Sequence, residues 1–209
     1  MQKKILSRRW LLSSALALAG WGAFLTGAQA QVRELAGARF EPAVNIAGSR
    51  LVLNGAGIRY KAIFKVYAAG LYVGSKANTL AGISAQSGPK RMHIVMLREI
   101  DANELGRLFT RGIEENTTRA EFVALVPGTI KMSEIFSSRR RLLSGEYFDA
   151  DWLPGTGLVV SVNGKPVGEP IKEPEFYNAL LRIWLGQVPA DFMLKDALLG
   201  VQASSSGTN

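Results

Sequence analysis

The sequence predicts an α+β protein built around an antiparallel β-sheet. Segments with strand periodicity form two blocks, and each block is followed by helical segments, an order that favours α+β over alternating βαβ units. Asn163-Gly164 separates two strand-like segments and is a strong signal for a two-residue hairpin. The chain has 47% hydrophobic and 20% charged residues, a balance typical of a globular protein. Its 209 residues suit one domain, or at most two small ones.

The first thirty residues have the pattern of a cleavable export signal. A basic start is followed by an apolar run over residues 10–25 and by the cleavage signal Ala28-Gln29-Ala30. We therefore expect residues 1–30 to be removed, the mature chain to begin at Gln31, and the protein to be periplasmic. The apolar run is also long enough for a retained membrane anchor, although Gly20, Gly22, Gly27 and the Ala-x-Ala end favour cleavage.

Two export routes remain open for this signal. The string Ser7-Arg8-Arg9-Trp10-Leu11-Leu12 resembles a twin-arginine signal, whereas the overall pattern also fits the ordinary secretory route. Beyond the leader we expect one domain over residues 31–202 and a disordered tail over residues 203–209.

Composition excludes several kinds of site. The chain has no cysteine, which rules out disulfides, thiolate metal sites and cysteine nucleophiles. His93 is its single histidine, so a His-rich metal site is excluded and a Ser-His-Asp triad would need His93. We expect no metal and no cofactor. Four of the eight net positive charges belong to the leader, and without them nucleic acid is not an expected partner.

The first half of the mature chain is rich in strand signals. Residues 31–50 predict an edge strand or an extended lead-in, and Gly55-Ala56-Gly57 predicts a turn after a short strand. Alternation of apolar and polar residues over 58–67 predicts a half-buried strand or a hairpin. Further strands are expected over 68–73 and 91–97, separated by a loop with one helical turn.

Helices follow, then a second block of strands and helices. Asp101 is placed to cap a helix that runs to about Asn116, and Pro127-Gly128 predicts a break between helices over 119–125 and 129–138. We then expect strands over 146–153, 157–163 and 166–171. Two final helices are expected over 174–185, closed by Gly186, and over 191–199.

Several strings together resemble the chalcone isomerase fold family, and most closely its exported bacterial members. The resemblance covers about residues 50–200 and implies an antiparallel sheet with helices packed on one side, an open-faced β-sandwich, with a ligand cleft between the layers. The strings are Leu53–Arg59, Phe64–Val73, Gly155-Thr156-Gly157, the Val162–Lys165 hairpin and Phe176–Gly186.

The resemblance also implies that the isomerase chemistry is lost. Arg59 matches the family arginine, but Tyr67 stands where the isomerases carry a threonine, and Gly112 falls near their asparagine. Leu105 and Ile183 replace a ketone-polarising tyrosine and a Ser or Thr, and neither can donate a hydrogen bond. We therefore expect no catalytic residues for ring closure.

A second branch of this fold family binds fatty acids without catalysis, through an arginine and a tyrosine that hold the carboxylate. Arg59 and Tyr67 resemble that pair, and Leu105 and Ile183 would line an apolar cleft. The prediction is a non-catalytic binder of a fatty acid or similar amphipathic carboxylate. Two alternatives remain open: an intramolecular lyase or isomerase acting on a phenolic or enone substrate, and an envelope interaction protein with a vestigial cleft.

Two geometric questions are left open by the sequence. A fully extended strand would hold Arg59 and Tyr67 roughly 26 Å apart, whereas a turn centred on Ile63 would place them opposite each other, about 5 Å apart. No Gly, Pro, Asn or Asp marks such a turn. The basic run Arg139-Arg140-Arg141 predicts a solvated turn that could touch anionic lipid headgroups transiently. No obligate protein partner is inferred.

Overall fold

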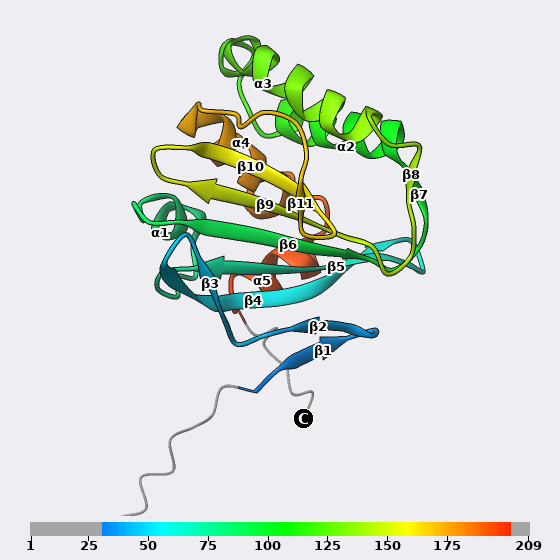
Figure 1. The fold of residues 1–209 in the computed structure, drawn as a ribbon, viewed down its shortest axis with the longest axis vertical. Helices are drawn as coiled ribbons and strands as arrows, with labels where there is room; N and C mark the ends of the chain where they lie inside the picture. The colour runs from blue at the N-terminus through cyan, green and yellow to red at the C-terminus, as the bar shows by residue number, and fades with distance from the viewer. Residues whose placement is uncertain (1–30, 202–209) are drawn as a thin grey trace, which may run out of the picture.

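A seven-stranded antiparallel sheet forms the centre of the protein, in a computed structural model that describes residues 31–201 (Figure 1). Its strand order is β11-β10-β9-β6-β5-β4-β3. The export signal and the tail 203–209 lie outside the described residues and stay predictions. The strands of this sheet are β3 (Ala43–Ile46), β4 (Ser49–Lys61), β5 (Phe64–Val73), β6 (Lys90–Met96), β9 (Tyr147–Leu153), β10 (Gly157–Val162) and β11 (Lys165–Pro166).

Two short strand pairs accompany the main sheet. One is β1 (Arg33–Leu35) with β2 (Ala38–Phe40), and the other is β7 (Ile100–Asp101) with β8 (Arg141–Leu142). The β1–β2 hairpin covers part of one sheet face, where Phe40 is fully buried. Residues 31–50 therefore contain three short strands and the start of β4, more than the single edge strand or lead-in expected.

All the main helices lie on the other face of the sheet. They are α1 (Leu80–Ser84), α2 (Ala102–Glu115), α3 (Arg119–Ser137), α4 (Pro174–Leu185) and α5 (Phe192–Leu198). In Figure 1, α3 packs beside α2, and its Phe136 reaches the sheet, where the ring centre lies 5.4 Å from that of Phe148 on β9. Alternate residues of β6, Met92, Ile94 and Met96, are buried beneath the helices in one large core that includes Trp184. The predicted α+β fold with helices on one side of an antiparallel sheet is confirmed.

The expected turn at Gly55-Ala56-Gly57 is wrong, because β4 runs straight through it. The two glycines instead permit close packing of α5. A Cβ atom at Gly55 would lie 2.0 Å from the carbonyl oxygen of Ala197, and one at Gly57 would lie 2.7 Å from the Cβ of Ala197. Glycine inside a strand can mark the close approach of another backbone as well as a bend.

The expected break at Pro127-Gly128 is also wrong, since α3 is continuous through both residues. Pro127 has no N–H to donate to the carbonyl of Val123. Val123 and Pro127 both lie on the exposed side of α3, where water can donate to that carbonyl instead. Gly128 faces inward, and a Cβ there would lie 2.3 Å from the Phe176 ring. Packing of α4 against α3 therefore outweighs the local helix-breaking signal.

The strand expected over 166–171 is mostly absent. Only Lys165–Pro166 form β11, and further along a single bridge joins Ile171 to Leu158. Gly168 has a φ of 70° and Pro170 lacks a backbone donor, so a regular ladder cannot continue.

The local caps and turns behave as expected. The Asp101 side chain accepts a hydrogen bond from the Glu104 backbone N–H at the start of α2, and Gly186 follows the last residue of α4. Asn163 and Gly164 have φ values of 49° and 76°, the positive values that the tight hairpin turn needs. Within residues 31–201, no helix has the length and hydrophobicity needed to cross a membrane.

Candidate ligand-binding cleft

The β4–β5 hairpin brings Arg59 and Tyr67 together. The two residues are direct cross-strand partners, and the chain reverses through Ala62-Ile63. Ala62 takes the turn conformation with a φ of 53°, an uncommon value for alanine. Because this position is not a glycine, the sequence carries no signal for the turn. The pairing register shifts by one residue after Arg59, so that Tyr60 pairs with Lys65 at the hairpin end. The turn about Ile63 that the pairing requires is present.

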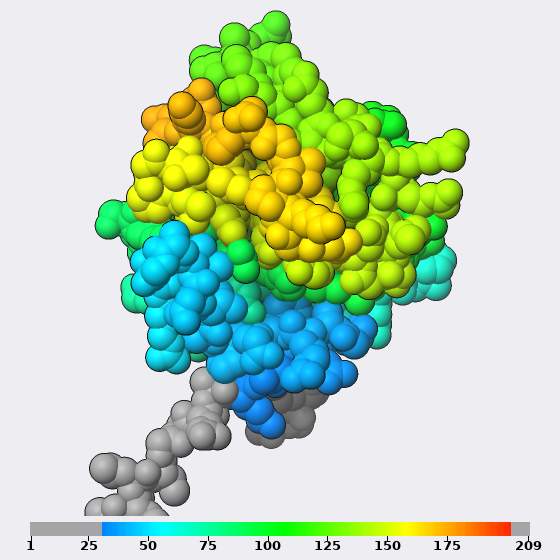
Figure 2. Space-filling view, viewed as in Figure 1, coloured from blue at the N-terminus to red at the C-terminus, as the bar shows by residue number. Residues whose placement is uncertain are grey.

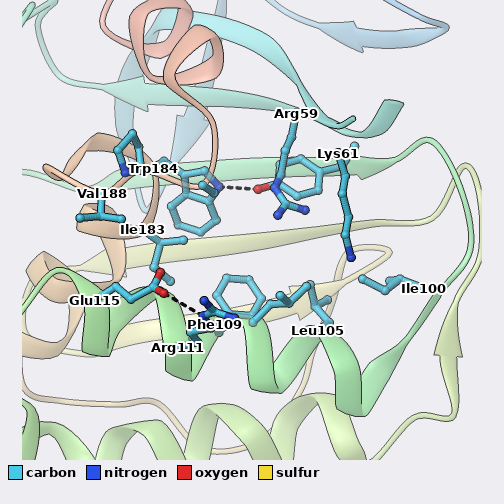
Figure 3. Close-up of a pocket in the computed structure, with 15 residues that line it drawn as sticks. Arg59, Lys61, Ile100, Leu105, Phe109, Arg111, Glu115, Ile183, Trp184 and Val188 are labelled. Carbon is cyan, nitrogen blue, oxygen red and sulfur yellow. Dashed lines mark hydrogen bonds and ion pairs between the residues drawn. The ribbon is translucent and has the colours of Figure 1, made fainter. Parts of the chain in front are cut away.

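A cavity of about 320 Å³ lies between this hairpin, α2 and the segment that joins α4 to α5 (Figure 3). The four residues singled out from the sequence, Arg59, Tyr67, Leu105 and Ile183, all line it. Their ligand roles stay predictions. The other lining residues are Lys61, Ile100, Leu108, Phe109, Arg111, Gly112, Glu115, Trp184, Val188, Pro189 and Ala190.

Most of the cavity wall is apolar and rigidly packed. Leu105 and Phe109 are one helical turn apart on α2, and both are buried, as are Ile183 and Trp184 on α4. A Cβ at Gly112 would lie 3.1 Å from Ile183, so the missing side chain gives Ile183 its place against α2. The wall suits an aliphatic or aromatic ligand body.

Arg59 brings an unused hydrogen-bond donor to this wall. Its Nε–H is buried and has no hydrogen-bond partner within residues 31–201. The guanidinium carbon lies 5.6 Å from the centre of the Tyr67 ring, a cation–π contact that holds the side chain over the hairpin (Figure 3). A buried donor without an acceptor costs about 1–3 kcal/mol, and more when it is charged. An acceptor that reached this N–H would remove that cost.

Tyr67 offers a second donor beside Arg59. Its buried hydroxyl oxygen accepts a hydrogen bond of 2.8 Å from Nε1 of Trp184. Burial raises the pKa of Tyr67 to about 12, against the opposing effects of Arg59 and of the Trp184 bond. The phenol is therefore neutral at neutral pH, and its own proton is available for a ligand oxygen.

The charged rim of the cavity and much of its apolar wall were not predicted from the sequence. Lys61 stands at the exposed hairpin end, and exposed Arg111 pairs with Glu115 at 2.8 Å. Phe109 follows Leu105 by four residues in the predicted helix, a spacing that places both on one helix face. Trp184 directly follows Ile183, but the sequence does not show that its indole reaches Tyr67.

The only histidine and its acidic neighbours lie on the opposite face of the sheet. His93 Nδ1 is 2.6 Å from Asp149 Oδ1, and the His93 ring packs against Phe40 of the β1–β2 hairpin. Arg91 binds Asp151 through two hydrogen bonds of 2.6 Å. Among the described residues, no cluster of potential ligands could hold a metal ion.

Asn116, at the end of α2, also lies outside the cavity wall. Its side-chain amide donates to the carbonyl oxygens of Gly112 and Val188 and accepts from the Val188 backbone N–H. It therefore fixes the α4–α5 link beside the cavity and contributes no group to the interior.

The comparisons with known proteins agree with this architecture. The fold is similar to the crystal structure of the Arabidopsis thaliana fatty-acid binding protein, with a TM-score of 0.63 and 17% sequence identity, over 81% of this chain and 96% of that one. No curated protein matches the sequence. The chalcone isomerase-like family model matches residues 32–200, which is most of the sequence. The chain therefore belongs to the chalcone isomerase-like family.

Proposed function

We propose that the protein binds a fatty acid or a similar amphipathic carboxylate, without catalysis, in the cavity beside Arg59. The observation that carries the proposal is Arg59 on a mostly apolar cavity wall, with a buried Nε–H that has no acceptor among the described residues. A carboxylate can accept from a guanidinium and from the neutral Tyr67 hydroxyl together, while its chain lies against Leu105 and Phe109. The similarity to a fatty-acid binding protein supports this choice of ligand class.

Cavity size limits the part of the ligand that is enclosed. One water-sized group fills about 30 Å³, so a cavity of about 320 Å³ encloses about ten non-hydrogen atoms. That number corresponds to a carboxylate with a medium-length chain. A longer acid would extend through the mouth between Lys61 and Val188.

Isomerase or lyase chemistry is less well supported. A phenolic or enone substrate would need several hydroxyl groups around its reacting oxygen to stabilise the developing charge. Leu105 and Ile183 supply none, and Tyr67 is the one hydroxyl-bearing residue among the described residues that line the cavity. An envelope interaction protein with a vestigial cleft is also less well supported, because the cleft is not filled by side chains.

We further propose that the mature protein acts in the periplasm, on the strength of the export signal in residues 1–30. In that compartment a carrier would meet acids released from membrane lipids. Mature protein in the periplasmic fraction, beginning at Gln31, would support this location. Full-length protein in the cytoplasmic or membrane fraction would contradict it.

Native mass spectrometry without detergent tests the ligand proposal. Wild-type protein expressed from the full-length chain is compared with Arg59→Ala. We expect a co-purifying acid of lipid mass in the wild-type protein and its loss in the variant. An empty wild-type protein whose melting temperature does not respond to a series of fatty acids would overturn the proposal and favour enone substrates or a protein partner.

A further inference from the structure

Exposed apolar side chains gather at the end of the β4–β5 hairpin, which also forms one wall of the cavity. Ile63 and Phe64 have 84% and 55% of their surface exposed, and Tyr60 beside them is also exposed. The hairpin end projects beyond the sheet at the right-hand side of Figure 1. Figure 2 shows it at the same edge of the space-filling surface. These three residues, with Lys61 and Lys65, are called the hairpin tip below.

A second exposed apolar group lies close to the hairpin tip. Val188, Phe192 and Met193 have 51%, 65% and 74% of their surface exposed, on the α4–α5 link and at the start of α5. Asp191 joins the two groups, because its Oδ2 accepts a hydrogen bond of 2.9 Å from the Tyr60 backbone N–H. Val188 lines the cavity, so apolar surface is exposed on both sides of the mouth.

Positive charge surrounds this apolar surface. Lys61 and Lys65 are exposed on the hairpin, and Arg98 lies over the Phe64 ring at 5.0 Å. The segment from Ile58 to Lys65 contains three basic residues and no acidic one. The nearby carboxylate of Glu99 pairs with Arg141, and that of Asp191 accepts from backbone N–H groups of Tyr60 and Leu194.

We propose that the hairpin tip docks on an anionic bilayer surface and brings the mouth of the cavity to the source of its ligand. The inference rests on the proposed function, because an acid with an aliphatic chain resides in membranes. Apolar side chains flanked by cations match the two layers of a membrane interface: Ile63 and Phe64 enter the acyl boundary, and the lysines meet the headgroups. Each basic side chain near an anionic surface strengthens binding about fivefold.

The basic triplet at residues 139–141 fits this role less well. Arg139 pairs with Glu146 at 3.3 Å and Arg141 pairs with Glu99 at 2.9 Å, so two of the three charges already have partners. Leu143 is the exposed large hydrophobic residue near the triplet. The membrane contact that the sequence suggested at the triplet is therefore proposed at the hairpin tip instead.

Vesicle flotation tests the docking surface. The purified protein is mixed with phosphatidylethanolamine vesicles containing phosphatidylglycerol, and in parallel with phosphatidylcholine vesicles. We expect binding to the anionic vesicles only, and a loss of at least about tenfold in Ile63→Ser/Phe64→Ser, because two apolar side chains no longer leave water. Lys65→Glu/Arg98→Glu should also lose binding, and its loss should shrink at high salt.

Two matched controls separate docking from general surface effects. Val123→Ser/Ile130→Ser removes exposed apolar side chains from α3, and Arg140→Glu reverses a charge in the basic triplet. Both should bind vesicles as the wild-type protein does. Equal losses in the controls and in Ile63→Ser/Phe64→Ser would overturn the proposed surface. Unchanged binding in Ile63→Ser/Phe64→Ser would also overturn it and assign the tip to a protein partner.

A parallel titration with decanoate, free of vesicles, keeps the two proposals apart. Ile63→Ser/Phe64→Ser should bind decanoate within about twofold of wild type, since neither residue lines the cavity. A wild-type protein that binds decanoate but not anionic vesicles would overturn the docking surface alone. A wild-type protein that binds vesicles but no acid would overturn the proposed ligand. It would also overturn the proposal that the tip brings the cavity to the source of that ligand.

Discussion

Two arginines on opposite faces of the same sheet have similar burial and different surroundings. Arg91 lies on the face covered by the β1–β2 hairpin, where Asp151 binds it through two hydrogen bonds and Asp149 stands 3.5 Å away. Arg59 lies on the helix-covered face, where its buried Nε–H has no partner within the described residues. One arginine is part of the folded framework, and the other is free to meet an anion.

The local sequence around an arginine therefore does not decide which of these two roles it takes. Each arginine is on a strand of the main sheet, and each has a tyrosine of β5 as its cross-strand partner, Tyr67 for Arg59 and Tyr72 for Arg91. What separates them is the next strand in the sheet: β9 places two aspartates beside Arg91, whereas β5 places Tyr67 beside Arg59. Three predictions test this contrast, in order of decreasing effect.

Removing the carboxylate shared on the Arg91 face should have the largest effect on stability. Asp149→Ala leaves His93 without its carboxylate partner, and leaves Arg91 with Asp151 alone, in a site with little exposed surface. We expect the free energy of unfolding in urea to fall by about 3 kcal/mol. Arg59→Ala is the comparison and should change it by less than about 1 kcal/mol, because loss of the cation–π contact with Tyr67 is offset by removal of a buried N–H that has no acceptor among the described residues. Equal losses in the two variants would contradict the contrast.

Removing a hydroxyl beside Arg59 should have an intermediate effect. Tyr67→Phe leaves the Trp184 N–H without its acceptor, at an expected cost of about 1–2 kcal/mol in the free energy of unfolding. Tyr177→Phe is a matched control, because the Tyr177 hydroxyl is buried without a partner among the described residues. That control should be neutral or stabilising, and a loss as large as that of Tyr67→Phe would count against the assigned hydrogen bond.

Alkaline pH should reveal a smaller effect of the same residue. The pKa of Tyr67 is raised to about 12 from an ordinary 10.0, so between these values the folded state holds a proton that the unfolded state has lost. Stability therefore falls as pH rises, by about 1 kcal/mol between about pH 9 and about pH 11 from Tyr67 alone. Burial raises the pKa of Tyr72 to about 12 as well, which adds a loss in the same direction.

The difference between wild type and Tyr67→Phe isolates this contribution, since Tyr72 is common to both proteins. Their unfolding free energies should converge as pH rises above 10. Parallel curves up to about pH 11 would show that Tyr67 is not shielded from water.

The fold was largely readable from the sequence, and the exceptions have a common cause. Asp101 and Asn163-Gly164 act locally, so their cap and turn were predicted correctly. Gly186 ends α4 where predicted, but its φ of −75° is open to any residue, and a Cβ there would lie 2.1 Å from Asn116 Oδ1. Gly55, Gly57 and Gly128 act through partners far away in the chain, the α5 backbone and the Phe176 ring. A local pattern cannot show such contacts, and these glycines were misread as a turn and a helix break.

The candidate site was partly readable for a similar reason. Arg59 and Tyr67 came from the family resemblance, but their pairing depended on a turn at Ala62-Ile63 that carries no turn residue. Trp184 and the Arg111–Glu115 pair became visible only when α2 and α4 were placed against the hairpin.

The central claim is that Arg59 holds a carboxylate, and a titration with a matched pair of ligands tests it most directly. Decanoate and decanol share one chain and differ in charge, and each is titrated into wild type, Arg59→Ala and Arg111→Ala. Arg111 lines the same cavity but is exposed and paired with Glu115. We predict that wild type and Arg111→Ala prefer the acid by at least about tenfold, and that Arg59→Ala loses this preference while it still binds decanol. An acid preference that survives in Arg59→Ala, or equal binding of the two ligands by wild type, would contradict the role of Arg59 in holding a carboxylate.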